Sequence, residues 1–448
     1  MLSIKNSTEN QSIHKLVNLN IDYKSIVANN DPSINWDDLS PLAFATKLVS
    51  AFYHNTLLRV EDVYFYYNGV YWKEISEKSQ IIQQKIPLLY IHYMSAYKFM
   101  ESKVSNWDVK RSIYSVIESL KGSFADAVMK KLKTVVYVAD ENIKWNAHDE
   151  LFAFEDAIFD INTGQQIEPR PDLYISVSCG YKYYAGFSDE EIATAKDNIC
   201  HFLIDICGGH ELANYMMHIL TSFLRQGNRE EKIYFLLGPG RNGKGTLMEL
   251  VQSALGNYYG ELKVEYYVNQ AKGENTPNVN LASVRHCRVL NTSEVGVNAD
   301  GSPQVFRADK VKRISGGDNM VARFLRSNVN HVFKAGKCII QTNVLPEFSG
   351  LNNSPAIIER FVCINLPHCY VNDPALLAQN PAVYKPRNSR IKDHFATDLY
   401  RFAFIALLFN YYTPCRDISM PEFVKKFIHQ HFATNVNTKV KEWIKTHL

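Results

Sequence analysis

The sequence predicts an α/β protein: a domain with a central, mostly parallel sheet follows a mainly helical α+β region and precedes a short helical tail. Three observations predict this class. A short apolar run leads through a glycine-rich loop into a helical pattern at residues 233–255. Helical spacing dominates residues 42–133, and strand patterns with turns fill residues 135–184. The expected organisation is a flexible arm at 1–40, an α+β region at 41–224, the sheet-containing core at 225–370 and a helical region at 371–448.

Composition sets limits on the function. The chain has 448 residues, and its 46% hydrophobic and 12% aromatic content excludes a disordered protein. The net charge of +3 means that a polyanionic partner would need a local concentration of Lys and Arg. No apolar run approaches the roughly 18 residues of a membrane helix. The eight cysteines contain no C-x-x-C pair, so neither a zinc module nor a disulfide framework is expected. We expect a soluble intracellular protein without a membrane partner.

An aromatic run, VYFYYNGVYW, interrupts the helical pattern at residues 63–72. The dipeptide Asn68-Gly69 is typical of a two-residue turn between strands, because both residues adopt positive φ easily. The run therefore predicts a β-hairpin within the helical region. Helices are expected again from about Asp189 to Leu224, and they can pack on either side of the boundary near residue 225.

A glycine-rich loop, GPGRNGKGT, follows the apolar run IYFLL and precedes the helical pattern LMELVQSAL. In this strand–loop–helix context, glycines let backbone N–H groups turn toward phosphate oxygens, and the helix adds its positive N-terminal end. A turn that merely caps the helix is the alternative. Lys244 is placed to reach the β- and γ-phosphates. The candidate ATP-binding residues are Gly238, Pro239, Gly240, Arg241, Asn242, Gly243, Lys244, Gly245 and Thr246.

The residue after the lysine departs from the usual pattern. A serine or threonine that binds Mg²⁺ normally stands there, but this position is Gly245 and the hydroxyl comes one residue later, at Thr246. Either Thr246 binds the metal through a shifted geometry, or water takes that place.

Hydrolysis also needs a carboxylate that handles metal or water and a group that senses the γ-phosphate. RVLNTSE predicts a strand that ends in Glu294, the candidate for metal and water. KCIIQTN predicts another strand that ends in Asn343, whose amide can hydrogen-bond the attacking water and a γ-phosphate oxygen. Arg360 enters a third strand and can reach the nucleotide of a neighbouring subunit. For each residue the alternative is an ordinary surface or turn position.

The stretch between the acid and the amide is basic. From residue 300 to residue 340 there are eight Lys or Arg against three Asp. Gly316-Gly317-Asp318 marks a turn, and residues 321–333 fit a hairpin. Basic and aromatic residues on a protruding hairpin suit the phosphates of a single nucleic-acid strand. The alternative is a solvated charged face.

Five segments in this order resemble the superfamily 3 helicase domain of poxvirus-type and phage-satellite-type primase-helicases: GPGRNGKGT, RVLNTSE, VKRISGGDNMVAR, IIQTNVLP and ERFVCINLP. The preceding FYYNGVYW, LFAFEDAIFDINTG and PRPDLYISVSCGYKYY resemble the helicase-associated N-terminal region of that family. The likeness covers roughly residues 50–420.

This resemblance implies an AAA+ core in a helicase that uses ATP and Mg²⁺. Such a helicase forms a homo-oligomeric ring, usually a hexamer, and translocates on single-stranded DNA at forked DNA of a virus, phage or plasmid. By family analogy Lys244 binds phosphates, Glu294 serves the acidic strand, Asn343 is the sensor and Arg360 is the inter-subunit finger. The hairpin is expected to line the central channel, and DNA contacts are implied for Lys312, Arg323 and Arg326.

Some residues depart from the family pattern. Val295-Gly296 follow Glu294 where a second acid is frequent, and Glu359 precedes Arg360 where a basic residue is frequent. Together with Gly245, the single acid keeps a second function open, a weakly hydrolysing AAA+ ring that acts as an origin-binding loader or scaffold. A small-molecule kinase needs an acceptor pocket and an arginine-bearing lid, and the sequence indicates neither. The first 40 residues are too few for a primase domain, so we expect a primase or polymerase on another chain or in a longer parent protein.

Overall fold

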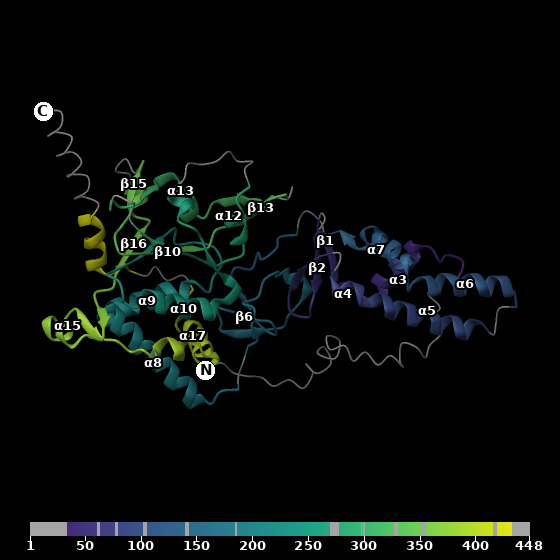
Figure 1. The fold of residues 1–448 in the computed structure, drawn as a ribbon, viewed down its shortest axis with the longest axis horizontal. Coiled ribbons are helices and arrows are strands. Elements are labelled where there is room, and N and C mark those ends of the chain that lie inside the picture. The colour runs from purple at the N-terminus through teal and green to yellow at the C-terminus, as the bar shows by residue number, and fades with distance from the viewer. Residues whose placement is uncertain are drawn as a thin grey trace. The chain divides into compact units, whose positions relative to one another are not determined.

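The computed structural model describes residues 34–431, apart from 61–62, 77–78, 102–104, 139–142, 184–185, 269–276, 297, 299–300, 327–329, 351–354 and 415–418. These residues form two compact units (Figure 1). The first unit holds the described residues up to His148 together with Glu168–Val177. The second holds Asp149–Ile167 and the described residues from Ser178 onward.

The first unit combines a helical bundle with a sheet in the order β3-β2-β1-β4. Its first helix begins where the Ser40 side chain accepts a hydrogen bond from the Ala43 N–H and Pro41 takes the first helical position. The helices are α3 (Pro41–Phe52), α4 (Gln80–Gln83), α5 (Lys85–Glu101), α6 (Trp107–Ser119) and α7 (Ser123–Val135). The strands are β1 (Leu57–Val60), β2 (Val63–Tyr67), β3 (Trp72–Ile75) and β4 (Tyr137–Val138).

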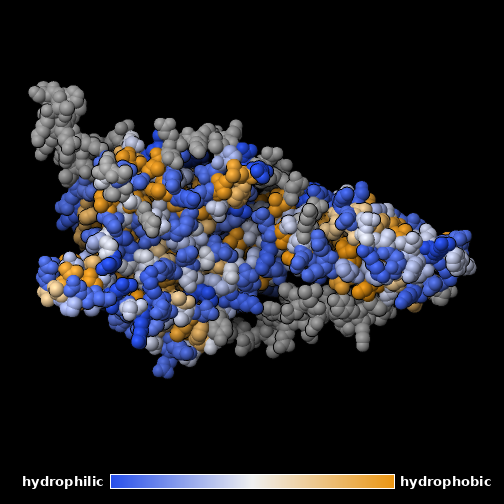
Figure 2. Space-filling model, in the orientation of Figure 1, coloured by the Kyte–Doolittle hydropathy of each residue, from blue (hydrophilic) through white to orange (hydrophobic). Residues whose placement is uncertain are grey.

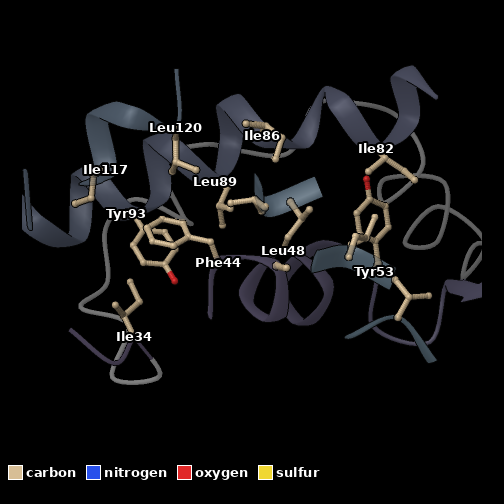
Figure 3. Close-up of a cluster of buried hydrophobic side chains, with 14 of the residues drawn as sticks. Ile34, Phe44, Leu48, Tyr53, Ile82, Ile86, Leu89, Tyr93, Ile117 and Leu120 are labelled. Atoms are coloured by element: carbon tan, nitrogen blue, oxygen red, sulfur yellow. The ribbon is translucent and has the colours of Figure 1, made fainter. Parts of the chain in front are cut away.

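Buried aromatic and aliphatic side chains from these helices form the core of the first unit (Figure 3). Phe44 of α3 stacks on Tyr93 of α5, with ring centroids 4.2 Å apart. Ile34 is 6% exposed and belongs to the same core, and Trp36 packs edge-on against Tyr93. Residues 34–40 are therefore part of the fold and not of a loose arm, because Ile34 is buried in this core and Trp36 and Leu39 pack against it half-buried. The rest of the expected arm lies outside the described residues.

The hairpin predicted at Asn68-Gly69 is confirmed, but its loop is longer than expected. Tyr67 pairs with Trp72, which leaves four residues in the loop between β2 and β3. The Asn68 side chain accepts hydrogen bonds from the N–H groups of Val70 and Tyr71, at 2.9 Å each. The asparagine side chain thus stabilises a wider turn than the two-residue type.

The second unit is built around a parallel sheet in the order β16-β8-β14-β10-β9 (Figure 1). Ile233 pairs with Phe361 on one side and with Cys338 on the other, and Val289 pairs with Lys337 and Tyr259. Because all neighbours are parallel, the carboxyl ends of the strands share one edge of the sheet. The strands are β8 (Ile233–Leu237), β9 (Tyr259–Glu261), β10 (Val289–Val295), β14 (Lys337–Thr342) and β16 (Phe361–Asn365).

Helices and small sheets surround this parallel sheet. The antiparallel strands β5 (Leu151–Ala153), β6 (Ile158–Asp160) and β7 (Gln165–Ile167) form one sheet. Three strand pairs are β11 (Val305–Arg307) with β15 (Glu347–Ser349), β12 (Asn319–Ala322) with β13 (His331–Lys334), and β17 (Cys369–Val371) with β18 (Tyr384–Pro386). The helices are α8 (Asp189–Cys207), α9 (His210–Ser222), α10 (Lys244–Leu255), α11 (Glu265–Val268), α12 (Val279–Ser283), α13 (Ala308–Ser315), α14 (Pro355–Ile358), α15 (Pro374–Gln379), α16 (Ile391–Phe395) and α17 (Asp398–Tyr411).

The part of the chain that the structure describes has no domain boundary near residue 225, where the sequence predicts one, because α17 packs on the helices that precede this position. The apolar run from Phe402 to Phe409 is buried, as its sequence predicts, and α17 contacts α8, α9 and α10. The two helices before the boundary, α8 and α9, therefore belong with the sheet, because a helix from much later in the chain covers their apolar faces. For the same reason residues 371–411 are part of this unit and not a separate tail. A further helix spans residues 422–431.

Among the helices that the structure describes, none combines the length and the apolar character that crossing a membrane requires. The cysteines within the described ranges are all free thiols.

Candidate nucleotide-binding site

A cleft of about 1490 Å³ lies in the second unit, along the carboxyl edge of the parallel sheet. Its walls are the glycine-rich loop, the ends of β9, β10 and β14, one side of α8 and residues 386–400. Seven of the nine predicted ATP-binding residues line it, namely Gly240, Arg241, Asn242, Gly243, Lys244, Gly245 and Thr246. Gly238 and Pro239 do not line the cleft, and they form the start of the loop after β8. The predicted strand–loop–helix order is confirmed by β8 and α10.

Two glycines allow the loop to fold tightly. Gly238 has a φ of +142°, and a Cβ there would lie 2.6 Å from the Leu366 carbonyl oxygen. Gly243 has a φ of +89°, and a Cβ there would lie 2.6 Å from Cγ2 of Ile206 on α8. A side chain at either position would push the loop away from the strand or the helix that it contacts. The loop conformation therefore depends on these glycines.

The loop is also supported from β17. The Tyr370 N–H donates a 2.8 Å hydrogen bond to the Arg241 carbonyl, and the Tyr370 hydroxyl donates a 2.7 Å bond to Asp205 on α8. Within the loop, the Asn242 side-chain amide donates to the Leu237 carbonyl. These bonds hold the backbone that would surround a phosphate between α8 and the strand end.

Lys244 lies at the floor of the cleft with 9% of its surface exposed. Its ammonium group donates hydrogen bonds to the Gly238 carbonyl at 2.7 Å and to the Asn343 side-chain oxygen at 3.1 Å. The structure thus brings the predicted phosphate-binding lysine and the predicted sensor amide together. Burial lowers the pKa of Lys244 to about 8.

We expect the affinity for ATP to fall as the pH rises through this pKa. Only the ammonium form attracts phosphate, and the protonated fraction of a group with a pKa of about 8 falls about tenfold between pH 7 and pH 9. Calorimetric titration of the full chain should therefore give a Kd for ATP that is about tenfold higher at pH 9. The Lys244→Ala variant should lack this dependence, and a wild-type Kd that stays constant would contradict the assignment.

A polar network at the same edge contains an acid that the sequence did not indicate. The Asn291 amide donates to Glu261 at 2.8 Å, and the Tyr259 hydroxyl donates to the same carboxylate oxygen at 3.0 Å. Gln341 of β14 donates to the Asn291 side-chain oxygen at 3.1 Å. Burial, and then the Glu261 charge, raise the pKa of Tyr259, so its hydroxyl remains a donor. Glu261 is thus a carboxylate at the sheet edge of the cleft, held in place by hydrogen bonds from Tyr259 of β9 and Asn291 of β10.

Glu294 lies near the carboxyl end of β10. The pairing register between β10 and β14 shifts between Thr292 and Val295, so this residue stands at a strand irregularity of the kind often found beside active sites. Its neighbours Ser293 and Val295 line the cleft. The side chain of Glu294 lies outside what the structure describes, and its role with water and metal stays a prediction.

The cleft residues fit a magnesium ion bound together with phosphate. Mg²⁺ takes oxygen ligands, usually one or two from protein groups and the rest from waters and phosphates. Thr246 brings a hydroxyl and Glu261 a carboxylate into the cleft. A Cβ at Gly245 would have no atom within 4 Å, so crowding does not explain why this position lacks the serine or threonine that usually follows the lysine. Within the described ranges, no group of three or more His, Cys, Asp or Glu could hold a metal.

Arg360 does not line the cleft. It directly precedes β16, at the amino edge of the sheet, whereas the cleft lies at the carboxyl edge. Its guanidinium group pairs with Glu231 at 2.7 Å and donates a 3.3 Å hydrogen bond to the Ser315 hydroxyl. The structure therefore separates Arg360 from Lys244 of the same chain.

The predicted DNA-contacting residues lie away from the cleft. Lys312 is exposed on α13. The predicted hairpin is confirmed as β12 and β13, in which Val321 pairs with Val332. Arg323 directly follows β12, and Arg326 lies three residues later, exposed and with a φ of +58°.

Comparisons with known proteins give one family match and two viral relatives. Residues 46–208 match the family described as D5 N terminal like. This chain is 28% identical over 249 residues to "Putative helicase L207/L206" of Acanthamoeba polyphaga mimivirus. The matched region covers 55% of this chain and 25% of that protein. It is 22% identical over 233 residues to "Putative helicase 184R" of Invertebrate iridescent virus 6, which covers 51% of this chain and 23% of that protein. The chain thus spans about a quarter of the length of these relatives.

Among solved structures, the apo C-terminal region of NrS-1 aligns with 86% of this chain and 74% of its own chain, at 10% identity and a TM-score of 0.44.

Proposed function

We propose that this chain, which belongs to the D5-type superfamily 3 primase-helicase family, is the ATP-dependent motor of a ring-forming DNA helicase. The observation that carries the proposal is the hydrogen bond from Lys244 to Asn343. It joins a phosphate-binding lysine, in the loop after β8, to an amide that directly follows β14, the neighbour of β8 in the sheet. Both lie in a cleft at the carboxyl edge of this parallel sheet. Such an edge is where α/β proteins bind nucleotides. The strand order around β8 supports an AAA+ core.

In the proposed reaction the loop N–H groups and Lys244 bind the β- and γ-phosphates. To do so, Lys244 exchanges one of its two acceptors for a phosphate oxygen. Asn343 orients the attacking water, and Glu294 accepts its proton as the bond from the γ-phosphorus to the bridging oxygen breaks. Thr246, Glu261 and Glu294 would hold Mg²⁺, which would neutralise phosphate charge when bound.

We assign Glu261 to the same reaction as a ligand for metal and water, because its carboxylate lies in the cleft and is held by a hydrogen bond from Asn291 of β10. The Glu261→Gln variant should lower the rate of ATP hydrolysis at least about tenfold, since a neutral amide holds metal and water less strongly. ATP affinity, measured by calorimetry, should change less than about threefold. The matched control is Glu265→Gln on α11, outside the cleft. Equal hydrolysis rates in the two variants would contradict the role.

The proposal places DNA at the hairpin of β12 and β13. Val321 and Val332 form an exposed cross-strand pair, and Leu325 at the loop is 67% exposed. Figure 2 shows hydrophobic atoms among hydrophilic neighbours in the area where Figure 1 labels β13. Apolar side chains beside arginines suit bases and phosphates of one strand. Lys312, on the helix before β12, adds a third cation.

Replacing both Arg323 and Arg326 by alanine should weaken binding of single-stranded DNA and flatten its salt dependence. Each lost phosphate contact lowers the slope of log K against log salt by about 0.7, so the double variant should lose about 1.4. Fluorescence anisotropy with a labelled oligonucleotide at several salt concentrations measures this slope. The Lys130→Ala, Lys131→Ala double variant removes the same charge from the exposed side of α7 and should keep the slope. An unchanged slope in the arginine variant would remove the hairpin from the DNA path.

The proposal is tested by measuring ATP hydrolysis and strand separation on forked DNA. A helicase should hydrolyse ATP faster when single-stranded DNA is present and should unwind the fork only with ATP. The second candidate is an origin-binding loader or scaffold, which Gly245 favours because the usual Mg²⁺-binding hydroxyl is absent at this position. Such a protein should bind the fork without unwinding it, and DNA should not accelerate its ATP hydrolysis.

A further inference from the structure

The cleft extends well beyond the glycine-rich loop. Its volume of about 1490 Å³ exceeds the about 300–1,000 Å³ of a typical small-molecule site. The part away from the sheet is formed by α8 on one side and by α16 and the first turn of α17 on the other. The lining residues there are Asn198, Phe202, Ile391, His394, Phe395 and Tyr400.

Aromatic rings form a continuous wall in this part of the cleft. Phe202 meets Phe395 edge-on with centroids 5.0 Å apart, and Phe395 lies 5.5 Å from Tyr400. The rings of Tyr400 and His394 are nearly parallel, at an interplanar angle of 20° and a centroid distance of 6.0 Å. The Tyr400 hydroxyl accepts a 2.9 Å hydrogen bond from the Asn198 side-chain amide. This bond joins α17 to α8 across the wall.

The wall begins at the loop. A Cβ on Gly243 would lie 3.7 Å from Cε2 of Phe202, so the first ring touches the phosphate end of the cleft. Further along, Lys392 of α16 forms a 2.5 Å ion pair with Glu249 of α10, and both residues line the cleft. A molecule bound by the loop at one end would therefore meet aromatic rings at the other.

We propose that this aromatic wall is the subsite for the nucleobase of the bound nucleotide. The inference rests on the proposed function, because it takes the loop as the phosphate end. A nucleobase has flat π-faces that stack on aromatic side chains, and the Asn198 amide adds a polar group that can bond its edge. The residues after the sheet-containing core thus take part in nucleotide binding, and an inorganic triphosphate would occupy only the loop end.

The test compares two probes, the non-hydrolysable ATP analogue AMP-PNP and inorganic tripolyphosphate, by calorimetry on the full chain. Tyr400→Ala should raise the Kd for AMP-PNP at least about tenfold, as the loss of one base-stacking ring does elsewhere, and should leave the Kd for tripolyphosphate within about twofold. Tyr400→Phe keeps the ring and should resemble wild type. The matched control is Tyr411→Ala, on the same helix but outside the cleft.

The unchanged affinity for tripolyphosphate also shows that the Tyr400→Ala variant is folded. The proposal is overturned if Tyr400→Ala binds AMP-PNP like wild type, or if it loses both probes equally while Tyr411→Ala keeps both. Failure of the proposed function has a different signature, in which Lys244→Ala binds tripolyphosphate as tightly as wild type.

Discussion

Replacing Lys244 by alanine should abolish ATP hydrolysis and raise the Kd for ATP by about 100-fold or more. Truncating one partner of a buried, hydrogen-bonded charge pair costs about 2–5 kcal/mol, and a 100-fold loss of affinity, about 2.8 kcal/mol, lies within this range. We expect a cost of this size for Lys244 because its side chain is buried at the floor of the cleft, where its ammonium group contacts Gly238 and Asn343. Nucleotide calorimetry and phosphate release measure the two effects.

The control for this variant is Lys263→Ala, an exposed lysine of the same unit outside the cleft. It should keep both affinity and turnover. The Lys244→Ala variant should also remain folded. The Lys244 ammonium group donates to two acceptors in the structure, and its removal leaves the loop glycines in place. Hydrolysis by Lys244→Ala at more than about a tenth of the wild-type rate would show that the phosphates bind elsewhere.

Replacing Arg360 by alanine should reduce turnover by about 10³-fold or more while nucleotide binding changes little. An arginine finger stabilises charge that develops in the transition state, and supplying one accelerates hydrolysis by about 10³–10⁵. Arg360 lies at the amino edge of the sheet and is separated from the cleft of its own chain, so its proposed role as a finger requires the nucleotide of a neighbouring chain. Steady-state rates and calorimetry separate the two effects.

The ion pair with Glu231 provides the matched control. Arg360 must leave Glu231, 2.7 Å away, to reach another chain. Such partly exposed pairs stabilise a fold by only about 0–1 kcal/mol, so Arg360→Ala should remain folded. Glu231→Gln removes the same pair but keeps the arginine, and it should retain turnover. If the two variants lose turnover equally, the arginine acts through its own chain and the finger assignment is wrong.

Mixing two inactive variants tests the shared site further. Arg360→Ala keeps Lys244, and Lys244→Ala keeps Arg360. In a ring assembled at random from equal amounts, about a quarter of the interfaces would combine an intact cleft with an intact finger. Some activity should therefore return on mixing, and none should return if each chain works alone.

The sequence predicts the parts of the site that are encoded locally. The loop around Lys244 could be found because glycine, lysine and the flanking apolar runs are contiguous. The end of β14 at Asn343 and the hairpin of β12 and β13 were also predicted, since strand ends and turns leave short-range signals. These elements then meet because parallel strands end at one edge.

The parts that were missed depend on contacts between distant segments. Glu261 ends a strand of only three residues, too short for a periodic signal, and its partner Asn291 lies thirty residues later. The aromatic wall contains Phe202 and Phe395, which are far apart in the sequence. The packing of α17 on α8 brings the two rings together. The sequence places Ile34 in a loose arm, because the polar residues around it give no periodic pattern that a single buried side chain could reveal.

The central claim is that an active site needs two copies of the chain, one that binds the triphosphate and one that contributes the arginine. Turnover per protomer and sedimentation should be measured together over a wide range of protein concentration, with ATP and an oligonucleotide present. The account predicts that turnover rises from near zero to a plateau as the sedimenting species grows from one chain to a closed assembly. Full turnover at concentrations where only single chains sediment would contradict it.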